Sequence, residues 1–238
     1  LLPDIPQPPL HRRIPLLNLK LLGERNFGVS MAVLAIFGIG MLGGTYLLPL
    51  YMQKGLGYTA IMAGSVFLPV GLIQGVLSTC SGFLTRYVKP LFIAVTGILV
   101  MTLSFYFASR FTLHTTHAQI MLVLYLRGFG MGLTFAPLND FSLMNLSQCD
   151  MASAAGISNS IKQLSGSVSI ALLTVILTGR TAFHSAQGGL SSAESYVAGI
   201  SDDFLFVTFV SLASALPFLW LLRPRRKAAS FKSEGTGT

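Results

Sequence analysis

Two basic side chains stand inside long apolar segments of this sequence, where charge is rare. Arg127 lies in an apolar stretch from 118 to 137, and Lys162 lies in a small-residue stretch from 151 to 178. A cation at the centre of a bilayer costs about 2.5 kcal/mol or more unless a partner compensates it. The expected partner of Arg127 is either a carboxylate or substrate anion across a cavity, or backbone carbonyls at a kink beside Gly128. Lys162 is expected to extend its long stem to the membrane surface.

Acidic residues, the usual proton carriers inside membrane transporters, are expected elsewhere. The chain has 8 Asp and Glu, and all are expected in linkers, loops, tails or at helix ends. Asp202 and Asp203 fall in a Ser- and Gly-rich connection expected from 179 to 203. The sequence therefore predicts that a carboxylate coupling transport to protons lies outside this chain. The chain alone is not expected to transport.

Several other side chains suit a cavity for amphipathic molecules, which needs broad apolar and aromatic walls with few polar anchors. Asn159 and Gln163 lie four residues apart, on one helix face, and can offer neutral hydrogen bonds to a substrate or to another helix. The other candidates are adaptable, aromatic or amide side chains: Met41, Tyr46, Phe67, Gln74, Met131 and Phe135. Side chains of these types more often serve helix packing, and that alternative stays open.

Other chemistries find no support in the sequence. Cys80 and Cys149 lack partner ligands at metal spacing, and His114 and His117 form a pair without further ligands. The glycine run from 128 to 132 lies inside an apolar helix rather than after a strand, which argues against a dinucleotide loop. No metal, cofactor or nucleic acid is expected, and the chain is not expected to be an enzyme.

The composition is that of a polytopic membrane protein. Charged residues make up 10% of the chain, against about 25% in an average soluble domain, and hydrophobic residues make up 52%. The mean hydropathy is +0.68, and 24 Gly are spread through apolar runs, as in membrane helices. A soluble enzyme is not expected from such a composition.

Six windows are long and apolar enough to cross a bilayer core of roughly 30 Å, which needs about 20 residues. The expected spans are 27–51, 61–83, 90–108, 118–137, 151–178 and 204–222. Residues 1–26, rich in Pro and basic residues, are expected to form a cytoplasmic linker, and 223–238 a basic cytoplasmic tail. The expected fold is an all-α membrane protein with a six-helix domain from 27 to 222.

Orientation follows from the basic residues, because basic loops are retained in the cytoplasm. With both termini inside, most of the 16 Lys and Arg fall in the cytoplasm. Lys54, Arg110 and Arg180 then fall outside, and Arg127 and Lys162 fall within spans. The formal charge of +8 is therefore interpreted as an orientation signal rather than as a surface for nucleic acid.

The polarity of the spans repeats along the chain. Spans 90–108 and 204–222 contain nothing more polar than Ser, Thr, Tyr or Trp, whereas the other four carry or adjoin amides or charges. Since strongly polar side chains point toward protein or water, the two apolar spans are expected on the outside of the bundle. The order polar, polar, apolar occurs twice and predicts two three-helix repeats, a common plan of secondary transporters.

Four short segments are similar to one family of transporters. They are LPLYMQ (48–53), GYT (57–59), RGFGMG (127–132) and NSIKQLSG (159–166). Together with their surroundings, from about 15 to 223, they resemble the EmrB/QacA-type drug:proton antiporters, the 14-span branch of the major facilitator superfamily. One departure concerns the loop 82–90, which has Arg86 where the superfamily's gating loop has Asp. The charge-pair latch of that loop is therefore not carried over.

The resemblance implies that the six spans form the C-terminal half of a major facilitator fold. The chain lacks an initial Met and is expected to be the later part of a longer polypeptide. The implied activity is export of drugs or other amphipathic small molecules in exchange for protons, across a bacterial cytoplasmic (inner) membrane. The implied partners are the lipid bilayer, the N-terminal half of the same transporter, a small amphipathic substrate and protons.

Two other functions stay open. In the first alternative, the chain is a structural membrane module, such as a truncated product that only associates with other helices. In the second, it is a permease domain driven by a separate ATPase. The short connections after the second and fourth spans argue against the permease domain, because an ATPase needs a coupling helix in such a loop.

Overall fold

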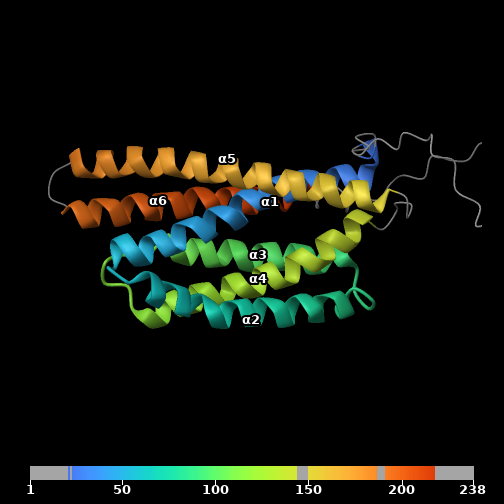
Figure 1. Cartoon of the computed structure of the whole chain (residues 1–238), viewed down its shortest axis with the longest axis horizontal. Coiled ribbons are helices and arrows are strands. Elements are labelled where there is room, and N and C mark those ends of the chain that lie inside the picture. Colours follow the sequence, from blue (N-terminus) through green and yellow to red (C-terminus); the bar gives the residue numbers. More distant parts are fainter. Residues whose placement is uncertain (1–20, 22, 144–149, 187–190, 218–238) are drawn as a thin grey trace, which may run out of the picture.

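The computed structural model describes residues 21, 23–143, 150–186 and 191–217, without the side chains of 25, 26 and 141–143. Its elements are α1 (Arg25–Leu50), the π-helical turn η2 (Tyr51–Gly55), α2 (Ala60–Leu84), α3 (Pro90–Ala108), α4 (His117–Leu143), α5 (Met151–Ala186) and α6 (Ser192–Ala213). Six of these helices are long and apolar enough to cross a membrane (Figure 1). The predicted all-α, six-span fold is confirmed. The expected basic tail and most of the expected linker lie outside the described residues.

Local chemistry fixes the start of three helices. The hydroxyl of Thr59 accepts an N–H of the first turn of α2 at 3.3 Å, after a turn in which Gly57 adopts a φ of 71°. Pro90 occupies the first turn of α3, where its missing N–H is not needed. Ser191 and Glu194 form a capping box at the start of α6.

Proline inside a membrane helix does not end it here. Pro137 was expected to end the fourth span, but α4 continues to Leu143. Neighbouring helices can compensate the hydrogen bond that a proline removes, so such residues are tolerated in membrane spans. Pro49 lies two residues before η2, in which the N–H of Leu56 bonds the carbonyl of Tyr51 at 3.2 Å.

The helices form two intertwined triplets, α1–α3 and α4–α6. The second helix of each triplet packs against the first helix of the other, because α2 contacts α4 and α5 contacts α1. The third helices behave in the same way, since α3 covers α4, α6 covers α1, and α3 and α6 contact each other. This matching set of contacts agrees with the two three-helix repeats predicted from the polarity pattern.

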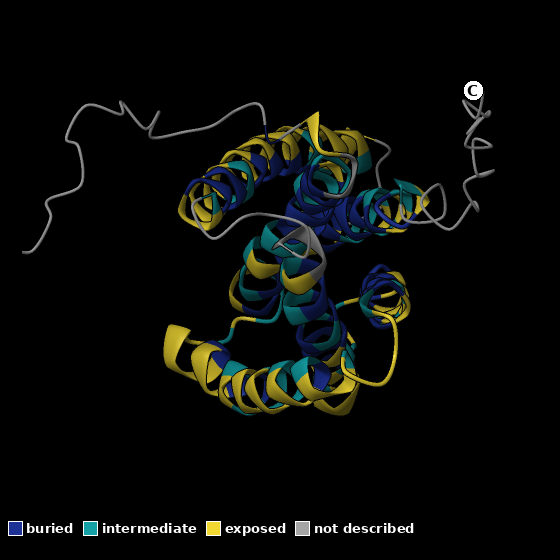
Figure 2. Ribbon diagram, turned by 90° about the vertical axis from the view of Figure 1, so that its right-hand side faces the viewer, coloured by how far each residue is buried: buried dark blue, intermediate teal, exposed yellow. Residues whose placement is uncertain are grey.

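The second helices of the triplets are the most exposed, and they lie on opposite sides of the bundle (Figures 1 and 2). Only 17% of the apolar window of α2 and 28% of that of α5 are buried, against 56% for α3 and 44% for α6. Within the described chain, the third and sixth spans are thus more buried than the second and fifth, and their expected position on the outside of the bundle stays a prediction. Those two helices pack on each other and on α4 and α1, which buries much of their surface.

The last two helices are longer than expected. The predicted connection from 179 to 203 is almost entirely helical, because α5 continues to Ala186 and α6 begins at Ser192. The capping box starts α6 early, and Asp202 is compensated from α5 by Arg180 at 3.4 Å and His184 at 3.0 Å. The 36 residues of α5 measure about 54 Å at 1.5 Å per residue, well above a bilayer core of roughly 30 Å. The expected last span therefore starts too late, and its residues 218–222 lie outside the described part.

Glycine allows the backbones of α3 and α4 to approach closely. A Cβ atom on Gly97 would lie 2.8 Å from the carbonyl oxygen of Gly130 and 2.9 Å from the backbone nitrogen of Thr134. A Cβ on Gly130 would likewise lie 2.8 Å from the carbonyl oxygen of Gly97. These neighbours are backbone atoms, which cannot rotate away as a side chain can. The contact between α3 and α4 therefore requires glycine at both positions.

We expect Gly97→Ala to lower the free energy of unfolding by about 1–3 kcal/mol, the usual cost of overpacking a core. Gly179→Ala on α5 is the matched control, because a Cβ there has no neighbour within 4 Å among the described residues. Thermal unfolding of the purified full-length protein in detergent measures both. Equal unfolding temperatures for the two variants would show that the close approach of α3 and α4 is not essential.

Candidate functional site

Arg127 of α4 is buried, with 3% of its surface exposed, and its guanidinium reaches α1. Its Nη2 donates to the carbonyl oxygen of Met41 at 3.1 Å and to the hydroxyl of Thr45. That hydroxyl also donates to the Met41 carbonyl at 2.8 Å, which closes a three-member polar cluster. The space comes from Gly44, because a Cβ there would lie 3.3 Å from Nε of Arg127. Within the described residues this cation bonds a carbonyl and a hydroxyl of α1 rather than the kink expected beside Gly128, and the expected acid or substrate anion across a cavity stays a prediction.

The charge of Arg127 is not neutralised within the described part of the chain. The ion pairs found there both involve Asp202, which lies on α6. Nε of Arg127 is buried and has no hydrogen-bond partner among the described residues. The guanidinium therefore keeps one unused donor, which suits an acceptor supplied from outside this part of the chain.

Lys162 of α5 also points to another helix. Its Nζ lies 4.6 Å from the centroid of the Phe135 ring on α4, a distance at which a cation is attracted by the ring face. Lys162 is half-buried, and its expected extension to the membrane surface stays a prediction. The aromatic ring stabilises the ammonium group locally, and the pair links α4 to α5.

Tyr46 links α1 to α5. Its hydroxyl shares a hydrogen bond of 3.3 Å with the hydroxyl of Thr174. Tyr46 and Thr174 also line a groove of about 430 Å³, together with Lys54, Thr181 and Tyr196 among others. Three pairwise contacts thus connect α1, α4 and α5, and each uses at least one residue that the sequence singled out.

The remaining predicted residues are not brought to these contacts. Asn159 and Gln163 are exposed on α5. Phe67, Met131 and the side chain of Met41 are partly buried against the hydrophobic core, which is the packing alternative. Gln74 is half-buried on α2, close to Gly132 of α4 through its backbone carbonyl.

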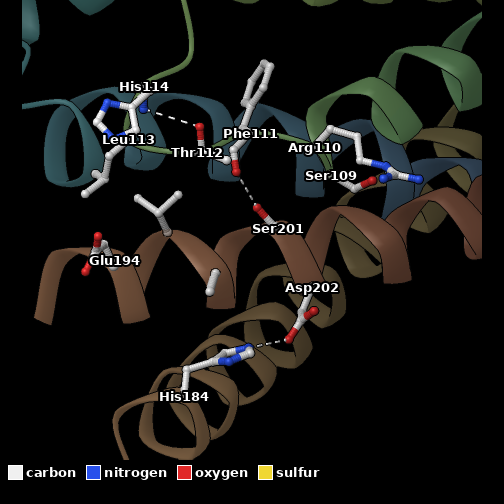
Figure 3. Close-up of a pocket in the computed structure, with 12 residues that line it drawn as sticks. Ser109, Arg110, Phe111, Thr112, Leu113, His114, His184, Glu194, Ser201 and Asp202 are labelled. Carbon is white, nitrogen blue, oxygen red and sulfur yellow. Dashed lines mark hydrogen bonds and ion pairs between the residues drawn. The ribbon is translucent and has the colours of Figure 1, made fainter. Parts of the chain in front are cut away.

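A second cavity, of about 570 Å³, lies where the connection after α3 meets α6 (Figure 3). It is lined by residues 109–114, by His184 of α5 and by α6 from Glu194 to Asp202. The hydroxyl of Ser201 donates to the carbonyl of Phe111 at 2.9 Å and holds the connection against α6. Sequence reasoning missed this cavity because it placed its α6 wall in a loop. No cluster of three or more His, Cys, Asp or Glu with metal-ligand geometry occurs among the described residues.

Asp203 is the functional candidate that sequence reasoning missed. It lies on α6 and its surface is fully buried. Neither carboxylate oxygen has a hydrogen-bond partner among the described residues. The expectation that no acid lies within a span is therefore wrong, since α6 has the length and hydropathy of a span. A coupling carboxylate can therefore lie within this chain as well as outside it.

Comparison with known proteins agrees with this helical arrangement. A family model described as Major Facilitator Superfamily matches residues 3–170. The chain belongs to the major facilitator superfamily. This assignment confirms the fold expected from the sequence, and it places the chain in a family of multi-pass membrane transporters.

Curated relatives narrow the family further. An uncharacterised MFS-type transporter, YhcA of Bacillus subtilis, is 31% identical over 173 residues, which cover 73% of this chain and 32% of the relative. The multidrug export protein EmrB of Haemophilus influenzae is 30% identical over 73% of this chain and 34% of its own length. The fatty acid resistance protein FarB of Neisseria gonorrhoeae is 24% identical over 90% and 49%. The resemblance to EmrB-type transporters is confirmed, and the chain spans a third to a half of these relatives.

The cluster around Arg127 can be tested by a double-mutant cycle. We expect Thr45→Val to destabilise the protein by about 1–3 kcal/mol, because a buried cation loses an acceptor. The same change in an Arg127→Met background should cost much less, since no cation then needs that acceptor. Thermal unfolding of the full-length protein gives both values.

Thr178→Val is the matched control, because the hydroxyl of Thr178 bonds only its own helix, at the carbonyl of Thr174. It should have little effect in either background. Equal costs of Thr45→Val with and without Arg127 would contradict a coupled cluster.

Proposed function

We propose that this chain is the C-terminal half of a transporter that exports amphipathic small molecules in exchange for protons. The proposal depends above all on similarity, over 73% of the chain, to proteins named multidrug export protein EmrB. Other relatives are named for resistance to lincomycin and to fatty acids, which are also amphipathic. The EmrB name states export, and export of such compounds would also account for the resistance that the other names state.

The partner that we propose for the chain is the N-terminal half of the same transporter. The exposed side chains of α2 include Ile61, Leu68, Leu72 and Val76, and those of α5 include Leu164, Val168 and Val175. A Cβ on Gly71 or Gly75 of α2 would have no neighbour within 4 Å among the described residues. Open glycine positions beside exposed apolar side chains suit close packing of another membrane helix. A second helical domain against α2 and α5 would use both features.

The proposed substrate surface lies on the helices linked by the three polar contacts. Tyr46, Phe135 and the exposed amides of Asn159 and Gln163 supply aromatic area with a few hydrogen-bonding groups. Such a surface fits molecules with both apolar and polar parts. The unused Nε–H of Arg127 would donate to a carboxylate of the partner half or to an anionic group of the substrate.

Two other functions are less well supported. A permease driven by a separate ATPase needs a cytoplasmic coupling helix, and the connection between α2 and α3 is confined to 85–89. A purely structural module gives no reason for a buried cation with an unused donor, because such a group costs stability. Export therefore explains more of the geometry than either alternative.

We also propose that the chain resides in a bacterial cytoplasmic membrane with both termini inside. The connection 109–116 would then face the outside and 85–89 the cytoplasm, as the distribution of Lys and Arg predicts. Thr112 and Tyr87 are exposed in these connections and suit cysteine labelling. We expect a membrane-impermeant thiol reagent to label Thr112→Cys on intact cells, in a background without native cysteines. Tyr87→Cys should react only after permeabilisation, and the reverse pattern would invert the proposed topology.

The activity itself is tested by dye efflux from cells that carry the full-length gene. We expect energised cells to export ethidium faster than cells without the gene, and a protonophore to abolish the difference while ATP is present. Inhibition of ATP synthesis at a maintained proton gradient should leave export intact. Export that survives collapse of the gradient but requires ATP would reject proton antiport in favour of the ATP-driven alternative.

A further inference from the structure

The buried carboxylate on α6 has a use that the proposed export activity does not assign to it. We propose that Asp203 is a proton-binding site of the transporter, loaded in the conformation described here and emptied when α6 separates from α1 and α5. This inference rests on the proposed proton antiport and names a residue that carries the proton. The reaction is the release of one proton from the carboxylic acid to water, which leaves a carboxylate.

Asp203 lacks every partner that would stabilise its charged form. Its side chain is fully buried, and no N–H, O–H or ammonium group of the described residues donates to either oxygen. Taking a carboxylate out of water without compensation costs several kcal/mol. Binding a proton removes that charge, so the neutral acid is the stable form at this position. The site is therefore loaded while it is closed.

The charged groups near Asp203 are already engaged elsewhere. On α6 itself, Asp202 pairs with Arg180 and His184 of α5. On η2, Lys54 lies 5.9 Å from the ring centroid of Tyr196.

Among the described residues, the cations of the other elements packed near this part of α6 also have contacts of their own. Beyond the end of α3, Arg110 donates to the hydroxyl of Tyr106 at 2.9 Å. Arg127 of α4 bonds α1, as described above. Tyr51 of η2 donates its hydroxyl to the carbonyl of Thr112 at 2.6 Å, and Tyr46 of α1 bonds Thr174 of α5. No ion pair involving Asp203 occurs within the described residues.

Water can reach the vicinity of Asp203 from two cavities. The cavity of about 570 Å³ includes Asp202, the preceding residue. The groove of about 430 Å³ includes Tyr196, which lies seven positions earlier and therefore on the same face of α6. The same groove includes Thr181, whose hydroxyl is a second buried polar atom without a hydrogen-bond partner among the described residues. A modest separation of the helices would thus hydrate the acid.

Glycine lies at contacts of both α6 and α1 with α5. Gly199 of α6 faces α5, where a Cβ would lie 2.6 Å from the hydroxyl oxygen of Thr181. Gly43 of α1 faces Ser169 of α5 in the same way, at 2.8 Å from its hydroxyl oxygen. Smooth faces of this kind resist sliding less than interlocked large side chains do. The closed and open states of the site can therefore differ by movement of α6 against its neighbours.

The first experiment measures protonation directly and does not depend on transport. Infrared difference spectra of the reconstituted full-length protein should show a carboxylic-acid C=O band at neutral pH in the wild type. That band should be absent in Asp203→Asn and retained in the matched control Asp202→Asn, whose carboxylate is paired. The inference would be overturned if the wild type showed no carboxylic-acid band, or if Asp203→Asn kept every such band of the wild type.

The second experiment measures coupling in proteoliposomes with ethidium as the probe. Asp203→Asn should reduce accumulation driven by a pH gradient to the level of empty liposomes, yet retain ethidium exchange without a gradient. Asp203→Glu, which keeps a titratable group, should recover part of the driven accumulation. It also serves as the second variant if Asp203→Asn does not fold. Driven accumulation by Asp203→Asn equal to that of the wild type would overturn the inference, because the buried acid would then be only structural.

The two proposals fail in different ways. If the wild type itself shows no accumulation driven by a pH gradient, proton antiport is rejected and Asp203 loses its proposed role in coupling. If the wild type is driven by the gradient and Asp203→Asn is driven equally, proton antiport stands and the role of Asp203 is rejected.

Discussion

A charge inside a membrane protein must find its partners within the protein, and Arg127 shows how strongly this constraint shapes the bundle. Its guanidinium satisfies part of its hydrogen-bonding capacity on α1, and Thr45 bonds both the cation and the carbonyl that the cation uses. This fixes the first helix of one triplet to the first helix of the other. Both helices are in turn covered by the second and third helices of the opposite triplet.

This intertwined arrangement explains which surfaces are left open. Because α1 and α4 lie at the centre, α3 and α6 are also largely covered, and the exposed apolar area is concentrated on α2 and α5. Exposed apolar side chains need no explanation where they face lipid. The open glycine positions on α2 need an explanation, because they leave the backbone accessible to another helix. The exposure pattern thus fits a chain that spans a third to a half of its relatives.

Polar groups of the bundle fall into two regions with different chemistry. Arg127 and Lys162 link α4 to α1 and α5, and their charges are balanced by a carbonyl, a hydroxyl and an aromatic ring. The acids of α6 lie near the connection after α3, where Asp202 is paired and Asp203 is buried without a partner. Arg127 and Asp203, the buried charged residues of the two regions, therefore have no ion pair within the described residues. Movement of the helices would change the solvation of each region separately.

The sequence alone determined the class of fold, because the length and hydropathy of each span are local properties. It placed the ends of the third span correctly and those of the second within one residue. It also identified Arg127 and the family, both of which depend on residues close together in the chain. The early start of α6 could also have been predicted from the sequence, because Ser191 and Glu194 have the spacing of a capping box.

Only the tertiary structure decided what the charged side chains contact. Arg127 bonds a carbonyl 86 residues earlier in the chain, and Lys162 meets a ring on another helix. Asp203 was expected at the end of a connection because the segment before it is polar and rich in Ser and Gly. Its neighbour is compensated by α5, and this allows the helix to continue and to bury Asp203. Burial and charge compensation depend on contacts between distant segments, and hydropathy along one segment does not contain that information.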